Sequence, residues 1–221
     1  MSGLKRMRGA SLLAAALFPI LICAQQKPAS AHDIATRVDR HYDQLHSLKA
    51  AFTESYAGMG VQRAESGELL LSKPGRMRWN YTSPPGKVFV LDGKYAWFYT
   101  PGDSQIQRLP AKELDDLRSP LRFLLGHTNL EKELGGLALR SGLNGEFVLS
   151  GVPKGQENRV ANISLTVTPA GVITGIVVEE TDGATTKFAF SNEQPDAPVA
   201  PKAFHFTPPA GVPVVDSPPP V

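Results

Sequence analysis

The chain has 221 residues, of which 42% are hydrophobic and 20% charged, a composition ordinary for a globular protein. Its formal net charge of +2 is misleading, because the first 31 residues carry four of the 23 bases and none of the 21 acids. The remainder, at about −2 with its charges interspersed, offers no basic surface for nucleic acid or anionic lipid. We therefore exclude nucleic acid as a partner.

The N-terminus has the features of a secretory signal peptide. Lys5, Arg6 and Arg8 precede an apolar run over residues 10–24 that is short for a membrane span. Cleavage after residue 24 and cleavage after residue 31 both fit, so we expect residues 1–31 to be a signal peptide and short linker. Either cut removes Cys23, the only cysteine. Lipoprotein signals have a small residue before the cysteine, and Ile22 stands there instead, so we favour a soluble exported protein over a lipid-anchored one.

The next part of the chain predicts a helix and then successive strands. Apolar residues at helical spacing predict an amphipathic helix over Asp33–Leu48, with Asp33 as its N-cap. A strand and turn pattern follows over residues 52–60. Alternating apolar residues then predict five strands, at residues 62–72, 76–83, 87–91, 94–100 and 104–109. Short turns, such as Asp92-Gly93, make these neighbours antiparallel.

A second helical block begins near Ala111, where leucines recur at spacings of three and four. Pro120 divides it into two short helices. The segment 119–125 (SPLRFLL) spreads apolar residues over more than one helix face, which is more than a simple covering helix needs and suits a movable lid. After a turn or helix at residues 130–134, we expect strands at residues 136–140, 146–151, 159–168, 171–181 and 185–192, and a short last strand with Phe204 and Phe206.

These elements predict a mainly β protein with helices (α+β), in which a curved antiparallel sheet is covered by helices that leave a groove or cavity. We expect one domain over residues 32–208. Nine of the 19 prolines lie in the last 27 residues, so we expect residues 209–221 to form a proline-rich extended tail.

The sequence shows no catalytic or metal-binding pattern. The five histidines have no spacing that places two on one metal, and neighbouring carboxylates such as Asp115 and Asp116 point apart. There is no phosphate-binding loop and no G-x-S-x-G nucleophile motif. We therefore expect neither an enzyme nor a metal or cofactor.

Large apolar residues alternate in two of the predicted strands, at Met77, Trp79 and Tyr81 and again at Tyr95, Trp97 and Tyr99. Taken alone, such residues fill a core more often than they line a binding site. The motifs around them nevertheless occur in a specific order: GELLLSKPGRMRWNY at 67–81, Pro85, FVLDGKYAWFY at 89–99, SPLRFLL at 119–125 and FHFTPPAGV at 204–212. In this order and spacing the chain resembles the LolA family of periplasmic lipoprotein carriers.

The resemblance implies an unclosed antiparallel β-barrel of about ten or eleven strands, with an N-terminal helix and lid helices over an apolar cavity for acyl chains. It also implies a periplasmic monomer. The expected cavity residues come from the sheet and from the lid, and are Met77, Trp79, Tyr81, Trp97, Tyr99, Leu121, Phe123, Leu124 and Leu125. A register error of one residue substitutes Ala96 and Phe98 for the set around Trp97.

The chain departs from the family at two expected site positions. Lys73, the expected lid latch, stands where relatives have an arginine, and its amino group lacks the planar fork of a guanidinium. Met77 stands where an aromatic residue is common, which keeps the apolar character and adds flexibility.

The resemblance further implies the partners: acylated lipoproteins as cargo, an inner-membrane ABC transporter that loads them, and an outer-membrane acceptor lipoprotein. Three alternatives remain open. The chain can be the lipid-anchored acceptor itself, which requires modification of Cys23, or a periplasmic module that senses lipid or lipoprotein. An enzyme acting on lipids is the third.

Overall fold

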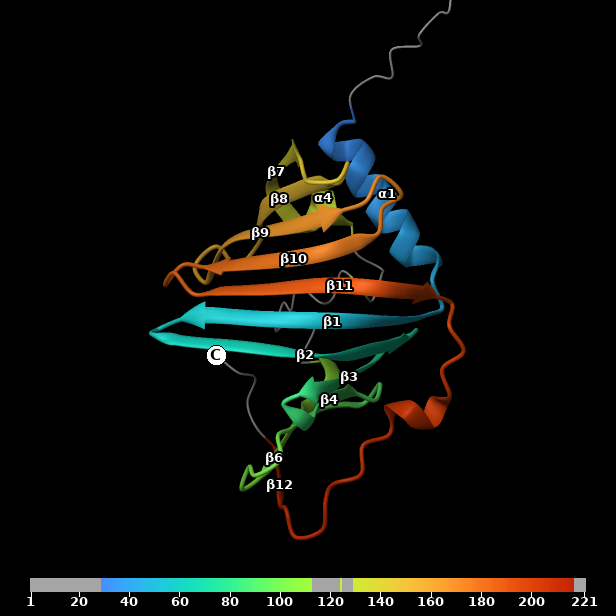
Figure 1. Ribbon diagram of the computed structural model, residues 1–221, viewed down its shortest axis with the longest axis vertical. Helices are drawn as coiled ribbons and strands as arrows, with labels where there is room; N and C mark the ends of the chain where they lie inside the picture. The colour runs from blue at the N-terminus through green and yellow to red at the C-terminus, as the bar shows by residue number, and fades with distance from the viewer. Residues whose placement is uncertain (1–28, 113–123, 125–128, 217–221) are drawn as a thin grey trace, which may run out of the picture.

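Twelve strands form one continuous sheet in the computed structural model, which describes residues 29–112, 124 and 129–216 (Figure 1). In this part of the chain the helices are α1 (Ala31–Gln44), α4 (Leu130–Glu133) and the 3₁₀ helix η1 (Pro201–Phe204). The strands are β1 (Ser47–Gly58), β2 (Val61–Ser72), β3 (Arg76–Ser83), β4 (Pro85–Leu91), β5 (Tyr95–Tyr99), β6 (Ile106–Pro110), β7 (Leu134–Ser141), β8 (Phe147–Pro153), β9 (Val160–Val167), β10 (Ile173–Glu180), β11 (Thr185–Pro195) and β12 (Val214–Asp216). Among the described helices, none has the length and apolarity to cross a membrane.

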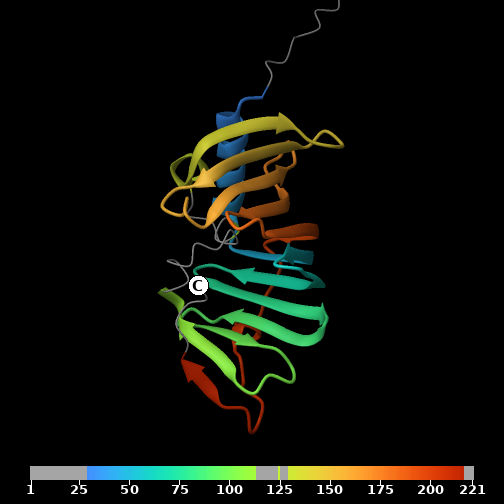
Figure 2. The ribbon, with the colours of Figure 1, turned by 90° about the vertical axis from the view of Figure 1, so that its left-hand side faces the viewer.

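The strand order is β12-β6-β5-β4-β3-β2-β1-β11-β10-β9-β8-β7. Strands β2 to β6 and strands β7 to β11 are two antiparallel meanders, and β1 joins them by pairing with both β2 and β11. The sheet curls without closing, since β12 and β7 remain its two edges (Figure 2). This confirms the expected mainly β class and unclosed sheet. The strand count exceeds the expected ten or eleven because β12, from the expected tail, pairs in parallel with β6.

The two faces of the sheet differ in what covers them. We call the face that α1 covers the inner face and the opposite one the outer face. The buried side of α1, with Ile34, Val38 and Tyr42, belongs to the same apolar core as Leu149 of β8 and Leu165 of β9. The turn between β9 and β10 also lies against α1, where Arg37 donates to the Pro169 carbonyl over 2.9 Å. The helix therefore fills the inner face over one half of the sheet.

Helix α1 begins and ends earlier than the sequence predicted. Its N-cap is Ser30, and Asp33 is instead the third helical residue of a capping box in which the two side chains cap each other's backbone N–H groups. The helix ends at Gln44, and Leu45 is already extended. Leu48, which fits the helical spacing, lies in β1 opposite Leu71, because strand pairing continues to the start of β1.

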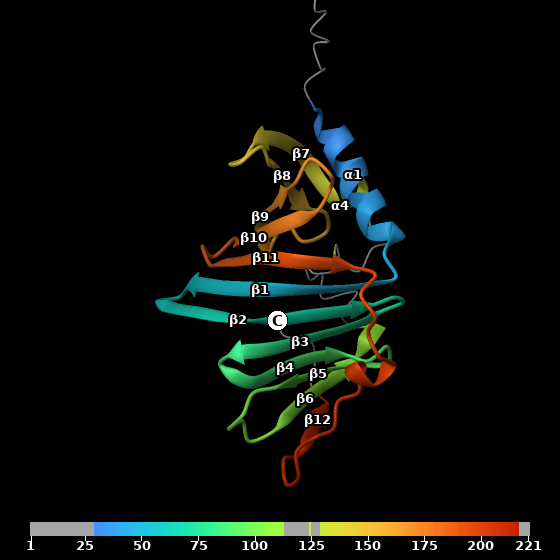
Figure 3. The same cartoon turned by 45° about the vertical axis from the view of Figure 1, so that its right-hand side comes forward.

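The C-terminal segment crosses the outer face and returns to the edge of the sheet (Figure 3). On β3, the Arg78 guanidinium donates to the Ala203 carbonyl over 3.1 Å. The predicted last strand is wrong: Phe204 ends η1, and Phe206 is buried against Trp97 and Tyr99. Phe204 and Phe206 alternate in the sequence because each packs at a different place, not because they lie in a strand.

Candidate functional site

A group of aromatic side chains covers the inner face where α1 does not. It surrounds Trp79, whose ring centre lies 4.4 Å from Phe52, 5.7 Å from Phe188 and 6.1 Å from Phe190. Across the neighbouring strands, Trp79 lies opposite Phe89, which in turn lies opposite Phe98. We call these residues, together with Tyr81, the aromatic floor: Phe52, Trp79, Tyr81, Phe89, Phe98, Phe188 and Phe190. All except Phe52 and Trp79 are only partly buried.

The structure brings together three of the sheet residues that the sequence predicted. Met77 and Trp79 are buried on the inner face, and Tyr81 follows them on β3. Gly67 lies opposite Tyr81 on β2, and a Cβ there would stand 2.0 Å from the Asn80 carbonyl oxygen. The absence of a side chain at Gly67 lets the rings of Phe52 and Tyr81 approach to 5.1 Å.

The prediction that Trp97 and Tyr99 share this face is wrong. Strand register places Trp97 opposite Val90, and Tyr99 opposite Val88, on the outer face. Both belong to a second apolar group, which we call the outer cluster: Val88, Val90, Trp97, Tyr99, Ile106, Phe206 and Val212. The inner-face positions of β5 are Ala96 and Phe98, the pair that the one-residue alternative names. Alternation could not decide which residues of β5 face inward, because the C-terminal segment covers the outer face and both faces of β5 are apolar.

One end of the aromatic floor is charged. We call this group the charged end; it consists of Glu54, Arg63, Glu65 and Lys87. The Lys87 ammonium bonds to Glu65 and lies 4.3 Å from the centre of the Tyr81 ring, and Arg63 lies 3.5 Å from the other oxygen of Glu65. The Tyr81 hydroxyl donates to Glu54 over 3.0 Å. Glu54 and Glu65 lie directly opposite each other on β1 and β2.

Burial governs the ionisation of this end. It raises the pKa of Glu54, an effect that the hydrogen bond from Tyr81 opposes and the nearby Glu65 reinforces. Burial also raises the pKa of the Tyr81 phenol well above its ordinary value, with Glu54 adding to the effect. Sequence reasoning missed the charged end. The signal was available, because Glu54 and Glu65 are equally far from the turn at Met59-Gly60 and must therefore pair in a hairpin.

Of the expected lid residues, only Leu124 is described. It is 2% exposed and belongs to the core cluster of the inner face. Leu121, Phe123 and Leu125 lie outside the described residues.

Lys73, the expected lid latch, bonds to the C-terminal end of α1. Its ammonium donates to the Tyr42 carbonyl and, over 3.2 Å, to the Asp43 carbonyl. These carbonyls are the acceptors that a helix C-terminus leaves unpaired. Burial lowers the pKa of Lys73, while Asp43 and Asp196 raise it. Within the described residues, Lys73 therefore secures α1.

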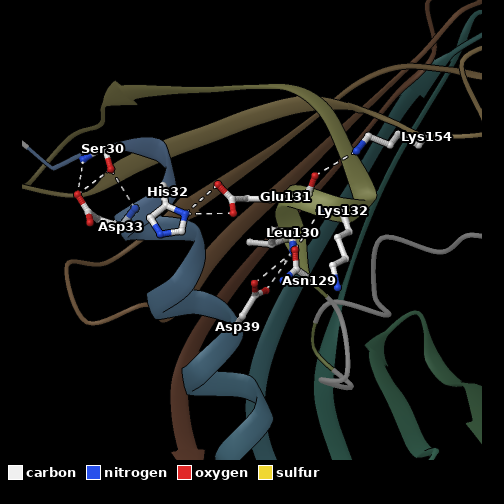
Figure 4. Close-up of polar contacts among 9 residues, drawn as sticks. All are labelled: Ser30, His32, Asp33, Asp39, Asn129, Leu130, Glu131, Lys132 and Lys154. Carbon is white, nitrogen blue, oxygen red and sulfur yellow. Dashed lines mark hydrogen bonds and ion pairs between the residues drawn. The ribbon is translucent and has the colours of Figure 1, made fainter.

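A polar junction joins α1 to α4, immediately after the predicted lid (Figure 4). Asp39 accepts from the Leu130 backbone N–H at 3.2 Å, and His32 Nδ1 lies 3.0 Å from Glu131. Lys154 donates to the Glu131 carbonyl over 3.1 Å. Burial raises the pKa of Asp39 to about 6, against the lowering effect of its bond to Leu130. The chain that returns from the predicted lid is thus fixed to α1.

The described residues hold no group of three or more His, Cys, Asp or Glu side chains arranged to bind a metal ion. The partly exposed rings of the aromatic floor and the ion pairs of the charged end together make an apolar surface with a charged end, which is suited to holding an amphiphile.

Known proteins resemble this chain over most of its length. Residues 43–207 match the family model described as outer membrane lipoprotein carrier protein LolA. The chain is 30% identical over 207 residues to the outer-membrane lipoprotein carrier protein of Sodalis glossinidius, with 93% of this chain and 97% of that protein covered. The protein of the same name from Proteus mirabilis is 31% identical over 188 residues, covering 83% and 89%.

Among solved structures, an uncharacterized conserved protein from Thermus thermophilus matches at a TM-score of 0.54 and 14% identity, covering 85% of this chain and 99% of that one. This likeness concerns the fold. From the family match and the near-complete alignment with its curated relatives, we conclude that the chain belongs to the LolA family of lipoprotein carrier proteins.

Proposed function

We propose that this protein is a periplasmic carrier that binds the acyl chains of lipoproteins on its inner face and delivers them to an acceptor at the outer membrane. The aromatic floor is the observation that carries the proposal, because five of its seven rings remain partly exposed on a face that is otherwise core. The names of the aligned relatives support the same role.

In this proposal the sheet contributes Met77, Trp79, Tyr81, Ala96 and Phe98 to the acyl-chain site. Leu124 covers them, together with Leu121, Phe123 and Leu125 as the rest of a lid. Lys73 acts as a latch indirectly, by fixing the C-terminal end of α1. The protein works as an exported monomer whose signal peptide has been removed, and it performs no catalysis.

The energetics define the partners. Burial of an acyl chain contributes about 0.8 kcal/mol per CH₂, or roughly 10 kcal/mol for a dozen methylenes, so extraction from a membrane is costly. The sequence has no phosphate-binding loop that could supply this energy from a nucleotide. An inner-membrane ABC transporter therefore loads the carrier, and an acceptor lipoprotein with higher affinity unloads it.

The test is release of a radiolabelled lipoprotein from inner-membrane vesicles. The purified mature protein is added with ATP, and native mass spectrometry of the soluble fraction identifies the product. We expect a one-to-one complex that requires ATP. Absence of the complex, with the protein folded, would contradict the carrier function.

A matched pair of variants on β11 tests whether lipoproteins bind the inner face of the sheet. Phe188→Glu places a charge on the aromatic floor, and Ala189→Glu places the same charge on the outer face of the same strand. We expect Phe188→Glu to abolish release and Ala189→Glu to retain it, with circular dichroism confirming that both fold. Equal release by both variants would count against the inner face as the site.

A further inference from the structure

Trp79 carries a buried hydrogen-bond donor without an acceptor. Its side chain is 1% exposed, and within the described part of the chain its indole Nε1–H has no hydrogen-bond partner. Buried donors are nearly always paired, since an unpaired one forfeits its bond to water. The rings of Phe52, Phe188 and Phe190 that surround the indole offer no oxygen or nitrogen to accept the bond.

Trp97, the second tryptophan, provides the contrast. Its indole N–H donates to the Asp92 carboxylate over 2.8 Å, in the ordinary way. It lies on the outer face, away from the aromatic floor. The missing acceptor is therefore particular to the indole of the inner face.

The surroundings of Trp79 are ordered along β3. On one side, the row of Met77 consists of apolar inner-face residues: Leu71, Met77, Leu91, Ala96 and Leu109. On the other side, the row of Tyr81 leads to Lys87 and Glu54 of the charged end. The unpaired donor stands between a hydrocarbon-like surface and a polar one.

We propose that Trp79 Nε1–H donates to the carbonyl oxygen of an ester- or amide-linked acyl chain, so that the site recognises the acyl linkage and not the hydrocarbon alone. The inference rests on the proposed function and specifies its ligand class. On binding, the acyl chain displaces the atoms that bury the row of Met77 in this structure, the carbonyl lies at Trp79, and the polar part of the ligand points to the charged end. A saturated hydrocarbon offers no acceptor, whereas an acyl carbonyl at this place does.

The experiment compares two lipids that differ only in the carbonyl. The probes are 1-monolauroylglycerol, an ester, and 1-O-dodecylglycerol, its ether analogue, each titrated below its micelle concentration by calorimetry. We expect the mature protein to bind the ester about fivefold more tightly than the ether, the size of one neutral hydrogen bond. Trp79→Phe keeps an aromatic ring, removes the donor and should abolish this preference, while Trp97→Phe should retain it.

A second measurement on the unmutated protein covers the case in which Trp79→Phe fails to fold. With ¹⁵N-labelled tryptophan, the two indole N–H groups are followed by NMR. The Trp79 indole proton should move downfield with the ester and not with the ether, and that of Trp97 should stay in place.

The outcomes separate the inference from the proposed function. Equal affinity for ester and ether, or a preference that survives Trp79→Phe, would overturn the role of Trp79 and leave the carrier function standing. Binding of neither lipid would overturn both.

Discussion

At the scale of single residues, the Asp39 carboxyl of α1, which bonds to Leu130 at the junction with α4, makes the stability of the protein depend on pH. Burial raises the pKa of its carboxyl to about 6 from an ordinary value of 3.8. The folded protein therefore holds this proton more tightly than the unfolded chain does, and stability falls as pH rises through the window between about 4 and 6. Asp43 and Glu131 contribute in the same direction by repulsion.

We expect Asp39→Asn to flatten this dependence. The amide oxygen still accepts from Leu130 N–H, but there is no charge to bury. Urea unfolding at pH 4 and pH 7 should show the variant gaining in free energy of unfolding, relative to the original protein, as pH rises. An unchanged difference at the two pH values would refute the assignment.

A separate prediction concerns how much Lys73 stabilises the protein through its bonds to α1. Lys73→Met removes the donor to the Tyr42 and Asp43 carbonyls and should cost about 1 kcal/mol of unfolding free energy. The control is Lys49→Met, which breaks an ion pair with Glu68 in which both side chains are about 40% exposed. Such pairs contribute little, so the control should lose less than about 0.5 kcal/mol in the same urea titration. Equal losses would show that Lys73 has no special role in securing α1.

At the scale of elements, the hydroxyl of Tyr42 links α1 to both β10 and β11. Tyr42 Oη accepts from Ile173 N–H over 3.1 Å and donates to Glu193 over 3.2 Å, and His41 lies 2.7 Å from the same carboxylate. Since Tyr42 is 1% exposed, no water can replace these bonds without a rearrangement.

We expect Tyr42→Phe to lower the free energy of unfolding by about 2 kcal/mol, because it leaves a buried N–H unpaired. Tyr99→Phe is the control, since its hydroxyl has no hydrogen bond to any described residue. Chemical denaturation measures both. A loss in Tyr42→Phe no greater than in the control would contradict the role of the hydroxyl.

Most strands were predictable because one face of each is buried and the other is wet, which leaves a period of two in the sequence. The prediction failed where both faces are apolar. In β5, residues 95–99 are all apolar or aromatic, and only the neighbours and the C-terminal segment determine which side faces inward. At the start of β1, Leu48 fitted both the helical and the strand pattern, and pairing with β2 decided between them.

The sequence predicted that one face of β3 is apolar, but it did not predict the full set of site residues. Alternation identified Met77, Trp79 and Tyr81 as one face, and the structure keeps them together. The charged end could be found only by pairing Glu54 with Glu65 across the turn at Met59-Gly60, since alternation within one strand does not reveal it. The unpaired indole depends on three-dimensional packing and leaves no pattern in the sequence.

At the scale of the whole molecule, the C-terminal segment covers the outer face of β4, β5 and β6. Phe206 is 9% exposed, with ring centres 5.5 Å from Trp97 and 6.2 Å from Tyr99. Beyond it, β12 pairs with β6, and Asp216 accepts two hydrogen bonds from Arg108. Phe206 and Val212 of this segment are therefore part of the outer cluster.

We expect Phe206→Ala to cost about 3 kcal/mol, because it opens a cavity over the outer cluster. Phe206→Leu should lose less than half as much. Thermal and urea unfolding give the stabilities, and increased binding of a fluorescent apolar dye by the alanine variant would report the uncovered surface. Equal stability of the two variants would mean that the segment does not pack in this way.

The strand order has a consequence for how the protein can be divided. The connection between β6 and β7 links the strand next to one edge of the sheet to the strand at the other edge. The part of the chain before this connection pairs with the part after it through β1 and β11 and through β6 and β12. A protease cut or a gene split between residues 112 and 129 leaves β1 to β6 on one fragment and β7 to β12 on the other, and the β1–β11 and β6–β12 pairings are then contacts between the two fragments. The two fragments, produced together in one cell, should reassemble, which makes this protein a candidate two-part reporter.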